Sequence, residues 1–86
     1  MYGILVYNFS DESTPLQHER FLLHLGKTFD TSEPVAENVI SFTLNRMRST
    51  TMEFAQNLKK KFAVDVFISL HYAEEDRESV FYSTKN

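Results

Sequence analysis

Apolar and polar residues follow different patterns in different segments of the chain, and two of these patterns predict strands. From Tyr2 to Phe9 the run YGILVYNF is rich in β-branched and aromatic residues, and both sets of alternate positions are apolar. This pattern is typical of a strand that is covered on both faces. From Asn38 to Asn45 the run NVISFTLN instead alternates between apolar and polar residues. It predicts a strand with one buried face and one face that is open to water or to a partner.

A capping pattern and a helical period predict the first helix. Thr14, Pro15 and Gln17 form a Thr-x-x-Gln capping box with proline at the first helical position. The helix is predicted to extend from Pro15 to about Gly26 or Phe29. Its apolar stripe consists of Phe21, Leu22, Leu25 and Phe29.

A second capping box, Thr50-x-x-Glu53, precedes a second helical period. The helix is predicted over Thr51 to Phe62. Lysines in its last turns suit the negative end of the helix dipole. Its apolar stripe consists of Met52, Phe54, Ala55, Leu58 and Phe62.

The segments between and after these elements complete the predicted order. Lys27 to Glu37 is predicted to be a loop, with a short strand at Lys27 to Asp30. Val64 to Tyr72 alternates as a strand, and Val80 to Ser83 is a last short strand. The charged run Glu74 to Glu78 is predicted to be the turn between them.

This order of strands and helices predicts an α+β fold of the ferredoxin-like split βαβ type, with two helices packed on one face of an antiparallel sheet. Residues 1–86 are expected to form a single domain. The other face of the sheet is expected to carry Tyr7 or its neighbours together with Ser41, Thr43, Phe67 and His71. An open face of this kind invites a partner. We therefore expect a homodimer, with Val39, Phe67 and His71 at the interface.

Composition narrows the classes of function. The chain has 86 residues, no cysteine and a formal net charge of −3. Disulfides and thiolate metal sites are therefore excluded. No apolar run approaches the length of a membrane helix and no leader-like basic segment is present, so we expect a cytoplasmic protein without a membrane partner. The net charge has the wrong sign for bulk attraction to nucleic acid, and such binding would need a local basic patch.

Two groups of polar residues are candidates for chemistry. Asn8 lies at the C-terminal end of the first strand, and Asp11 and Glu12 come just after it. The three fit either a metal or phosphate site or a solvated turn. His18 and His24 lie six positions apart on one helix, which is not the spacing of a pair of metal ligands, and His71 lies on a different strand. Surface or interface positions fit these three histidines better.

A basic set is the strongest nucleic-acid feature. It consists of Arg46, Arg48, Lys59, Lys60 and Lys61. The arginines precede the second helix and the lysines lie at its far end, so the two groups would align only across a two-fold dimer. The alternative interpretation is a complement to the helix dipole on a solvated face. The acidic run Glu74-Glu75-Asp76 is either a solvated turn or a mimic of phosphates in a partner's basic groove.

The opening residues carry a resemblance to a known family. Tyr2, Val6-Tyr7-Asn8, Ser10-Asp11 and a helix ending at Leu25-Gly26 resemble the small subunit of the CRISPR adaptation complex. The segment from Asn38 to Leu70 is similar to the GhoS type V antitoxin, a ribonuclease of the same ferredoxin-like group. The resemblance implies binding of RNA or DNA and hydrolysis that depends on Mg²⁺. The chain departs from the family at Asn8, where an acidic residue is expected, and an amide binds Mg²⁺ poorly.

The sequence therefore predicts a small homodimeric nucleic-acid-binding protein of toxin–antitoxin or CRISPR-adaptation type. Asn8 and Asp11 are the candidate residues for an endoribonuclease activity, and no cofactor other than Mg²⁺ is implied. The alternative is a non-enzymatic module, a regulator or a phage-type inhibitor, that binds a protein partner through the open sheet face or the acidic turn.

Overall fold

The computed structural model of the chain describes residues 2–43, 51–71 and 80–85. These residues form five strands and two helices. In chain order the elements are β1 (Tyr2–Phe9), α1 (Pro15–Thr28), β2 (Thr31–Ala36), β3 (Val39–Thr43), α2 (Thr51–Phe62), β4 (Val64–His71) and β5 (Val80–Ser83). Within the described part, no helix is long and apolar enough to cross a lipid bilayer.

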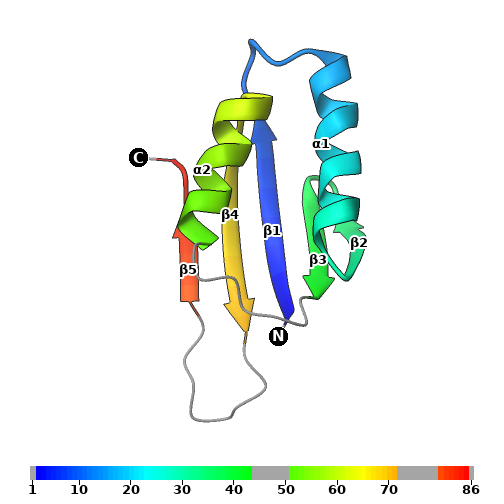
Figure 1. The fold of residues 1–86 in the computed structure, drawn as a ribbon, viewed down its shortest axis with the longest axis vertical. Coiled ribbons are helices and arrows are strands. Elements are labelled where there is room, and N and C mark those ends of the chain that lie inside the picture. Colours follow the sequence, from blue (N-terminus) through cyan, green and yellow to red (C-terminus); the bar gives the residue numbers. More distant parts are fainter. Residues whose placement is uncertain (1, 44–50, 72–79, 86) are drawn as a thin grey trace.

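The strands form one sheet in the order β2-β3-β1-β4-β5, and all neighbouring strands are antiparallel. The β1–α1–β2 and β3–α2–β4 units each skip one strand position, which is the split βαβ arrangement. Both helices lie on the same face of the sheet (Figure 1). The predicted α+β arrangement is confirmed, and β5 extends it beyond four strands at the β4 edge.

The predicted short strand at Lys27 to Asp30 is wrong, because α1 continues to Thr28 and β2 occupies Thr31–Ala36. Every residue of β2 is exposed, so its side chains show no alternation that a sequence could reveal. Backbone pairing with β3 holds it in place, together with a contact of 2.6 Å between the hydroxyls of Thr31 and Thr43. The register shifts after Pro34, which has no N–H to donate.

The core lies between the sheet and the two helices. The capping box that was predicted for α1 is present, because the N–H of Gln17 donates to Oγ1 of Thr14 at 3.2 Å and the N–H of Thr14 donates to Oε1 of Gln17 at 2.9 Å. This start orients α1 so that its buried side chains face the sheet. The buried apolar residues are Leu5, Phe21, Leu25, Phe29, Ile40, Phe42, Ala55, Leu58, Phe62, Val64, Val66, Ile68 and Leu70.

The central strand β1 is covered on one face, which corrects the prediction that both faces are covered. Leu5, Tyr7 and Phe9 face the helices, and the ring of Tyr7 lies 5.1 Å from that of Phe21. Val6 is 38% exposed on the opposite face. Burial of both faces of β1 would require a covering layer on each side of the sheet. In the described part of the chain both helices lie on one side, so the other face of β1 is left open. The open face therefore receives neighbours of Tyr7 and not Tyr7 itself.

Candidate functional site: a basic groove between the helices

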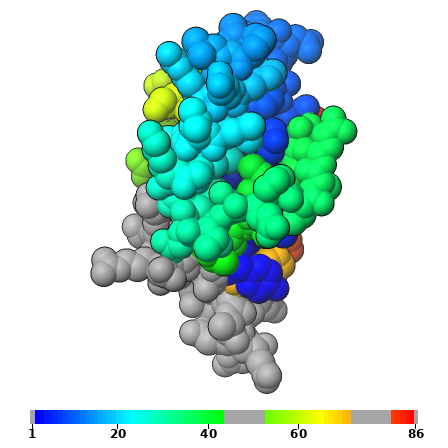
Figure 2. All heavy atoms as spheres, turned by 90° about the vertical axis from the view of Figure 1, so that its right-hand side faces the viewer, coloured from blue at the N-terminus to red at the C-terminus, as the bar shows by residue number. Residues whose placement is uncertain are grey.

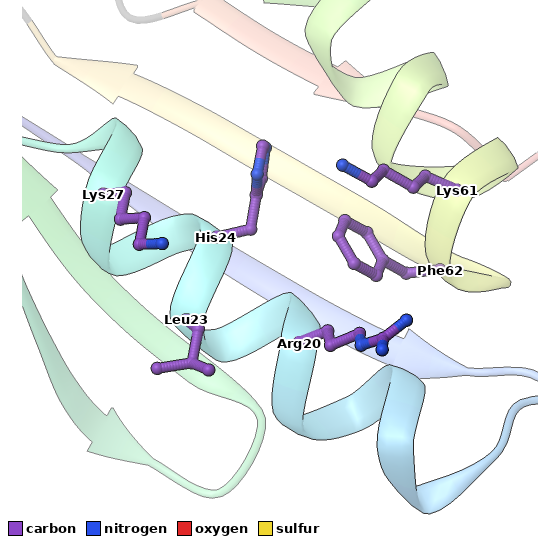
Figure 3. A pocket seen from close by; sticks show the side chains of 6 residues that line it. All are labelled: Arg20, Leu23, His24, Lys27, Lys61 and Phe62. Carbon is purple, nitrogen blue, oxygen red and sulfur yellow. The ribbon is translucent and has the colours of Figure 1, made fainter.

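A groove of about 330 Å³ separates α1 from the end of α2 (Figure 3). Three of the side chains that line it are those of basic residues, and no carboxylate of the described residues lines it. The lining residues are Arg20, Leu23, His24, Lys27, Lys61 and Phe62.

The helical period of α1 explains how three of these residues come to share one side. Arg20, His24 and Lys27 follow one another at intervals of four and three residues, which places them along one flank of a helix. This flank lies beside the stripe that buries Phe21 and Leu25. Burial of that stripe against the sheet therefore turns the basic flank toward α2.

On the opposite wall, Lys61 precedes the buried Phe62 at the end of α2. The Nζ of Lys61 lies 5.4 Å from the centroid of the Phe62 ring, within the range of a cation–π contact. This contact directs the ammonium group into the groove, where Figure 3 shows it extending toward α1.

The charges in the groove have no carboxylate partner among residues 2–43, 51–71 and 80–85. Arg20, Lys27 and Lys61 form no ion pair within the described part of the chain. Burial lowers the pKa of His24 below its ordinary value of 6.5, and the positive charges of Lys61 and Lys27 lower it further. A bound anion would relieve the mutual repulsion of these groups.

A second hollow of about 320 Å³ continues the groove along α2. It shares His24, Lys61 and Phe62 with the first and adds Phe54, Asn57 and Leu58. The ring of His24 lies 5.5 Å from that of Phe62 and 6.5 Å from that of Phe54. The two hollows together form a trough with basic walls, aromatic rings and one amide.

The predicted basic set is divided by the structure. Lys59 points toward the C-terminal segment, where its Nζ lies 3.2 Å from Oδ1 of Asp65 and donates to the carbonyl of Thr84 at 3.0 Å. Lys60 is exposed, and Lys61 lines the groove. Consecutive residues on an α-helix point about 100° apart, which follows from 3.6 residues per turn. Arg46 and Arg48 lie outside the described residues, as does the run Glu74-Glu75-Asp76.

Sequence reasoning missed Arg20 and Lys27, which belong to a helix with no run of basic residues. The signal that could have found them is their spacing with His24 along one flank. The partner wall could not have been found in this way, because Lys61 reaches the groove through the packing of α2 against α1.

The segment after β1, which contains Asp11, is attached to the end of α2 by two serines. The N–H of Ser10 donates to the carbonyl of Ala63 at 2.9 Å, and the hydroxyl of Ser13 donates to the carbonyl of Phe62 at 3.3 Å. These bonds satisfy carbonyl groups at the end of α2, which lack partners within the helix. Among the described residues no hydrogen bond joins Asn8 to Asp11.

Asn8 lies opposite Asp65 in the pairing of β1 with β4. Burial by itself would raise the pKa of Asp65, but hydrogen bonds from Lys59 and Thr84 outweigh it and lower this pKa. The carboxylate is thus already engaged within the fold. The described residues contain no group of three or more His, Cys, Asp or Glu placed to hold a metal ion. The Mg²⁺ site implied by the resemblance stays a prediction.

The three histidines lie in three different places. His18 stacks on Phe9 with ring centroids 3.8 Å apart, and its buried Nε2 has no hydrogen-bond partner among the described residues. His24 lies in the groove. His71 stacks on Tyr2 at 4.9 Å, and its Nε2 lies 2.7 Å from Oγ of Ser69. They do not form a shared site.

The predicted interface residues all lie on the face of the sheet that the helices leave open. Val6 pairs with Val39 on one side and with Phe67 on the other, and His71 pairs with Tyr2. The structure therefore has two separate surfaces of interest, the groove on the helix side and the open face behind it.

Comparisons of the chain with models of protein families, with curated proteins and with solved structures find no match. The resemblance to the CRISPR-adaptation subunit and the GhoS antitoxin stays a prediction that rests on the residues quoted for it.

Proposed function

We propose that the protein binds nucleic acid by holding its phosphate backbone in the groove between α1 and α2. The observation that carries this proposal is the convergence of Arg20, Lys27 and Lys61 on one groove, which no carboxylate in the described part of the chain lines. The whole chain has a net charge of −3, so these cations form a local patch on an acidic protein. Such a patch attracts an anionic polymer at short range.

The shape of the trough favours an extended, single-stranded ligand. The basic flank from Arg20 to Lys27 spans seven residues of helix, or about 10 Å at ~1.5 Å per residue. Aromatic rings and the amide of Asn57 lie in the continuing hollow. Cationic walls beside aromatic rings are the usual means by which proteins hold single strands without strong sequence preference.

The proposal concerns binding. Hydrolysis through Asn8 has no support in the geometry, because Asn8 is an amide and its neighbour Asp65 is held by Lys59 and Thr84. The experiment therefore reads affinity and does not depend on turnover.

The test is fluorescence anisotropy with a labelled single-stranded RNA of about 16 nucleotides, the upper end of common site sizes. Lys61→Glu and Lys27→Glu are each expected to raise Kd by about tenfold, or about 1.4 kcal/mol. Lys60→Glu is the matched control, because it reverses the same charge at an exposed neighbouring position outside the groove. It is expected to change Kd by less than about twofold, as long-range charge effects are screened by salt.

Two results would contradict the proposal. One is the absence of binding by the unaltered protein at low salt, and the other is an equal loss of affinity in Lys60→Glu and Lys61→Glu. A DNA strand of the same sequence is the second ligand, because contacts to phosphate alone predict similar affinities for RNA and DNA. A clear preference for RNA would add recognition of the 2′-hydroxyl.

A second candidate function is a non-enzymatic protein-interaction module. The observation that favours it is the set of large apolar side chains exposed on the open sheet face.

A further inference from the structure

The open face of the sheet has an apolar centre. Tyr2 and Val6 of β1 are 54% and 38% exposed on this face, and Phe67 of β4 and Phe81 of β5 are 40% and 60% exposed. The rings of Phe67 and Phe81 stack at 5.9 Å. Figure 2 shows the molecule from the β2 edge, with α1 in cyan on one side and β2 in green on the other. Clustered apolar exposure of this kind marks contact surfaces.

The centre of this face is also uncharged. Ile4 pairs with Ser41 and Ser69, and Val6 pairs with Val39 and Phe67. Ionisable side chains among the described residues of this face lie toward its margins. Glu33 lies on the edge strand β2, and Asp65 lies at the start of β4, where Lys59 neutralises it. A neutral centre provides no positive charge to attract the phosphates that the groove is proposed to bind.

We infer that this face is the contact surface for a second copy of the chain. In a two-fold contact the same patch faces itself, so residues near the axis meet their own kind. Charges at the centre would repel one another in such an arrangement, whereas Ile4, Val6 and Phe67 bury apolar area on both sides. This contact uses none of the residues that line the groove.

The area of the face agrees with a reversible dimer. The sheet has five strands of four to eight residues. At spacings of about 4.8 Å between strands and about 3.3 Å between residues, it measures roughly 500 Å². Two copies would bury about 1,000 Å², which is near the lower limit for a specific interface. We therefore expect exchange between monomer and dimer.

A shallow hollow on this face could receive a side chain from the second copy. It has a volume of about 150 Å³ and lies at the Asn8 end of the face, and the residues that line it include Val6, Asn8, Asp65 and Phe67. Tyr2 projects at the other end of β1, held by its stack on His71. A two-fold axis that lies in the contact plane and crosses the strands places Tyr2 of each copy over the hollow of the other.

The test is the solution mass, measured by sedimentation equilibrium without nucleic acid. At about 100 µM, a concentration suited to an interface of this size, the unaltered protein is expected to weigh close to twice its 10.1 kDa. Phe67→Glu and Phe81→Glu are expected to weigh as single chains. Phe81 lies on the edge strand, so its variant preserves the fold even if the β4 variant does not, and far-UV circular dichroism verifies folding.

Leu16→Glu is the matched control, because Leu16 is 53% exposed on α1, away from both the sheet face and the groove. It is expected to dimerise like the unaltered protein. A single-chain mass for the unaltered protein at this concentration would overturn the inference. So would a dimer that persists in both folded phenylalanine variants, or one that Leu16→Glu abolishes, since the contact would then lie elsewhere. None of these results bears on whether a single groove binds a short oligonucleotide.

Discussion

The backbone N–H of Val66 donates a hydrogen bond to Oγ1 of Thr84 at 2.9 Å. Thr84 is 2% exposed, and its hydroxyl donates in turn to Oδ1 of Asp65 at 3.1 Å. The N–H of Thr84 also donates to the carbonyl of Val66 at 3.1 Å. One side chain thus continues the pairing of β4 beyond the end of β5 and attaches the C-terminal segment to the sheet.

Replacing Thr84 by valine keeps the shape of the side chain and removes the hydroxyl. The buried N–H of Val66 then loses its acceptor, which costs about 1–3 kcal/mol of unfolding free energy. Urea denaturation is the measurement. Thr84→Ser keeps the hydroxyl and is expected to retain most of this contribution. A loss in Thr84→Ser without a loss in Thr84→Val would contradict the assignment, because the effect would then follow the methyl group and not the hydroxyl.

The two glycines are expected to respond to alanine with opposite signs. A Cβ at Gly3 would collide with the ring of Phe42 and lie 2.8 Å from the backbone oxygen of Ser69. Gly3→Ala should therefore destabilise the fold by about 1–3 kcal/mol. Gly26 lies within α1, and a Cβ there meets no atom within 4 Å. Gly26→Ala should stabilise the fold by about 0.5–1 kcal/mol. Thermal or urea unfolding of the pair decides whether both signs hold.

Ala63 is expected to be a site where glycine stabilises the protein. It follows α2 with a φ of 54°, in the left-handed region, and its N–H donates to the carbonyl of Lys59 at 3.0 Å. That conformation costs a residue with a side chain about 1–2 kcal/mol. Ala63→Gly should therefore raise the unfolding free energy, by up to about 1 kcal/mol after the greater flexibility of the unfolded chain is counted. Asn38 has a φ of 61°, but asparagine tolerates this region, so Asn38→Gly should gain less.

His24 makes oligonucleotide binding depend on pH. Its pKa in the free protein lies below 6.5, because burial and the charges of Lys61 and Lys27 oppose protonation. A phosphate in the groove opposes these charges and raises the pKa, so binding takes up a proton and strengthens as the pH falls below 6.5. Anisotropy titrations at several pH values measure this trend. His24→Gln should remove it, and an unchanged slope in that variant would assign the proton to another group.

The same lowered pKa has a consequence for stability. The unfolded chain protonates His24 near 6.5, whereas the folded chain does so at lower pH. The contribution of His24 to stability is therefore fully present above 6.5 and is lost as the pH falls from there through the folded pKa. The unaltered protein should lose more unfolding free energy than His24→Gln over this interval. Urea midpoints at matched pH values measure the difference.

Local sequence was sufficient for most of the fold. Residues Tyr2 to Phe9 and Thr51 to Phe62 match β1 and α2 to the residue, because strand-forming composition and helical periodicity are properties of short segments. Thr14 and Gln17 set the start of α1 in the same way. β2 had no such pattern, since it is exposed throughout and exists through backbone pairing with β3.

The candidate site was less accessible to sequence reasoning, because it depends on how two helices approach. Lys59 and Lys61 are alike in sequence, yet one binds Asp65 and the other lines the groove. Only the orientation of α2 on the sheet separates these roles. The open face of β1 was missed for a related reason, since apolar composition does not reveal how many layers cover a strand.

The placement of both helices on one face has a consequence for how ligand length would affect binding. In a dimer joined through the open faces, the two grooves point away from each other, about 40 Å apart if sheets and helices stack at about 10 Å per layer. A short oligonucleotide occupies one groove. A strand long enough to wrap around the dimer reaches both grooves. Once one groove has bound it, the rest of the strand is present at a high effective concentration near the second groove, which strengthens binding. Affinity should then rise in a step with ligand length, and a single-chain variant such as Phe81→Glu should lack that step.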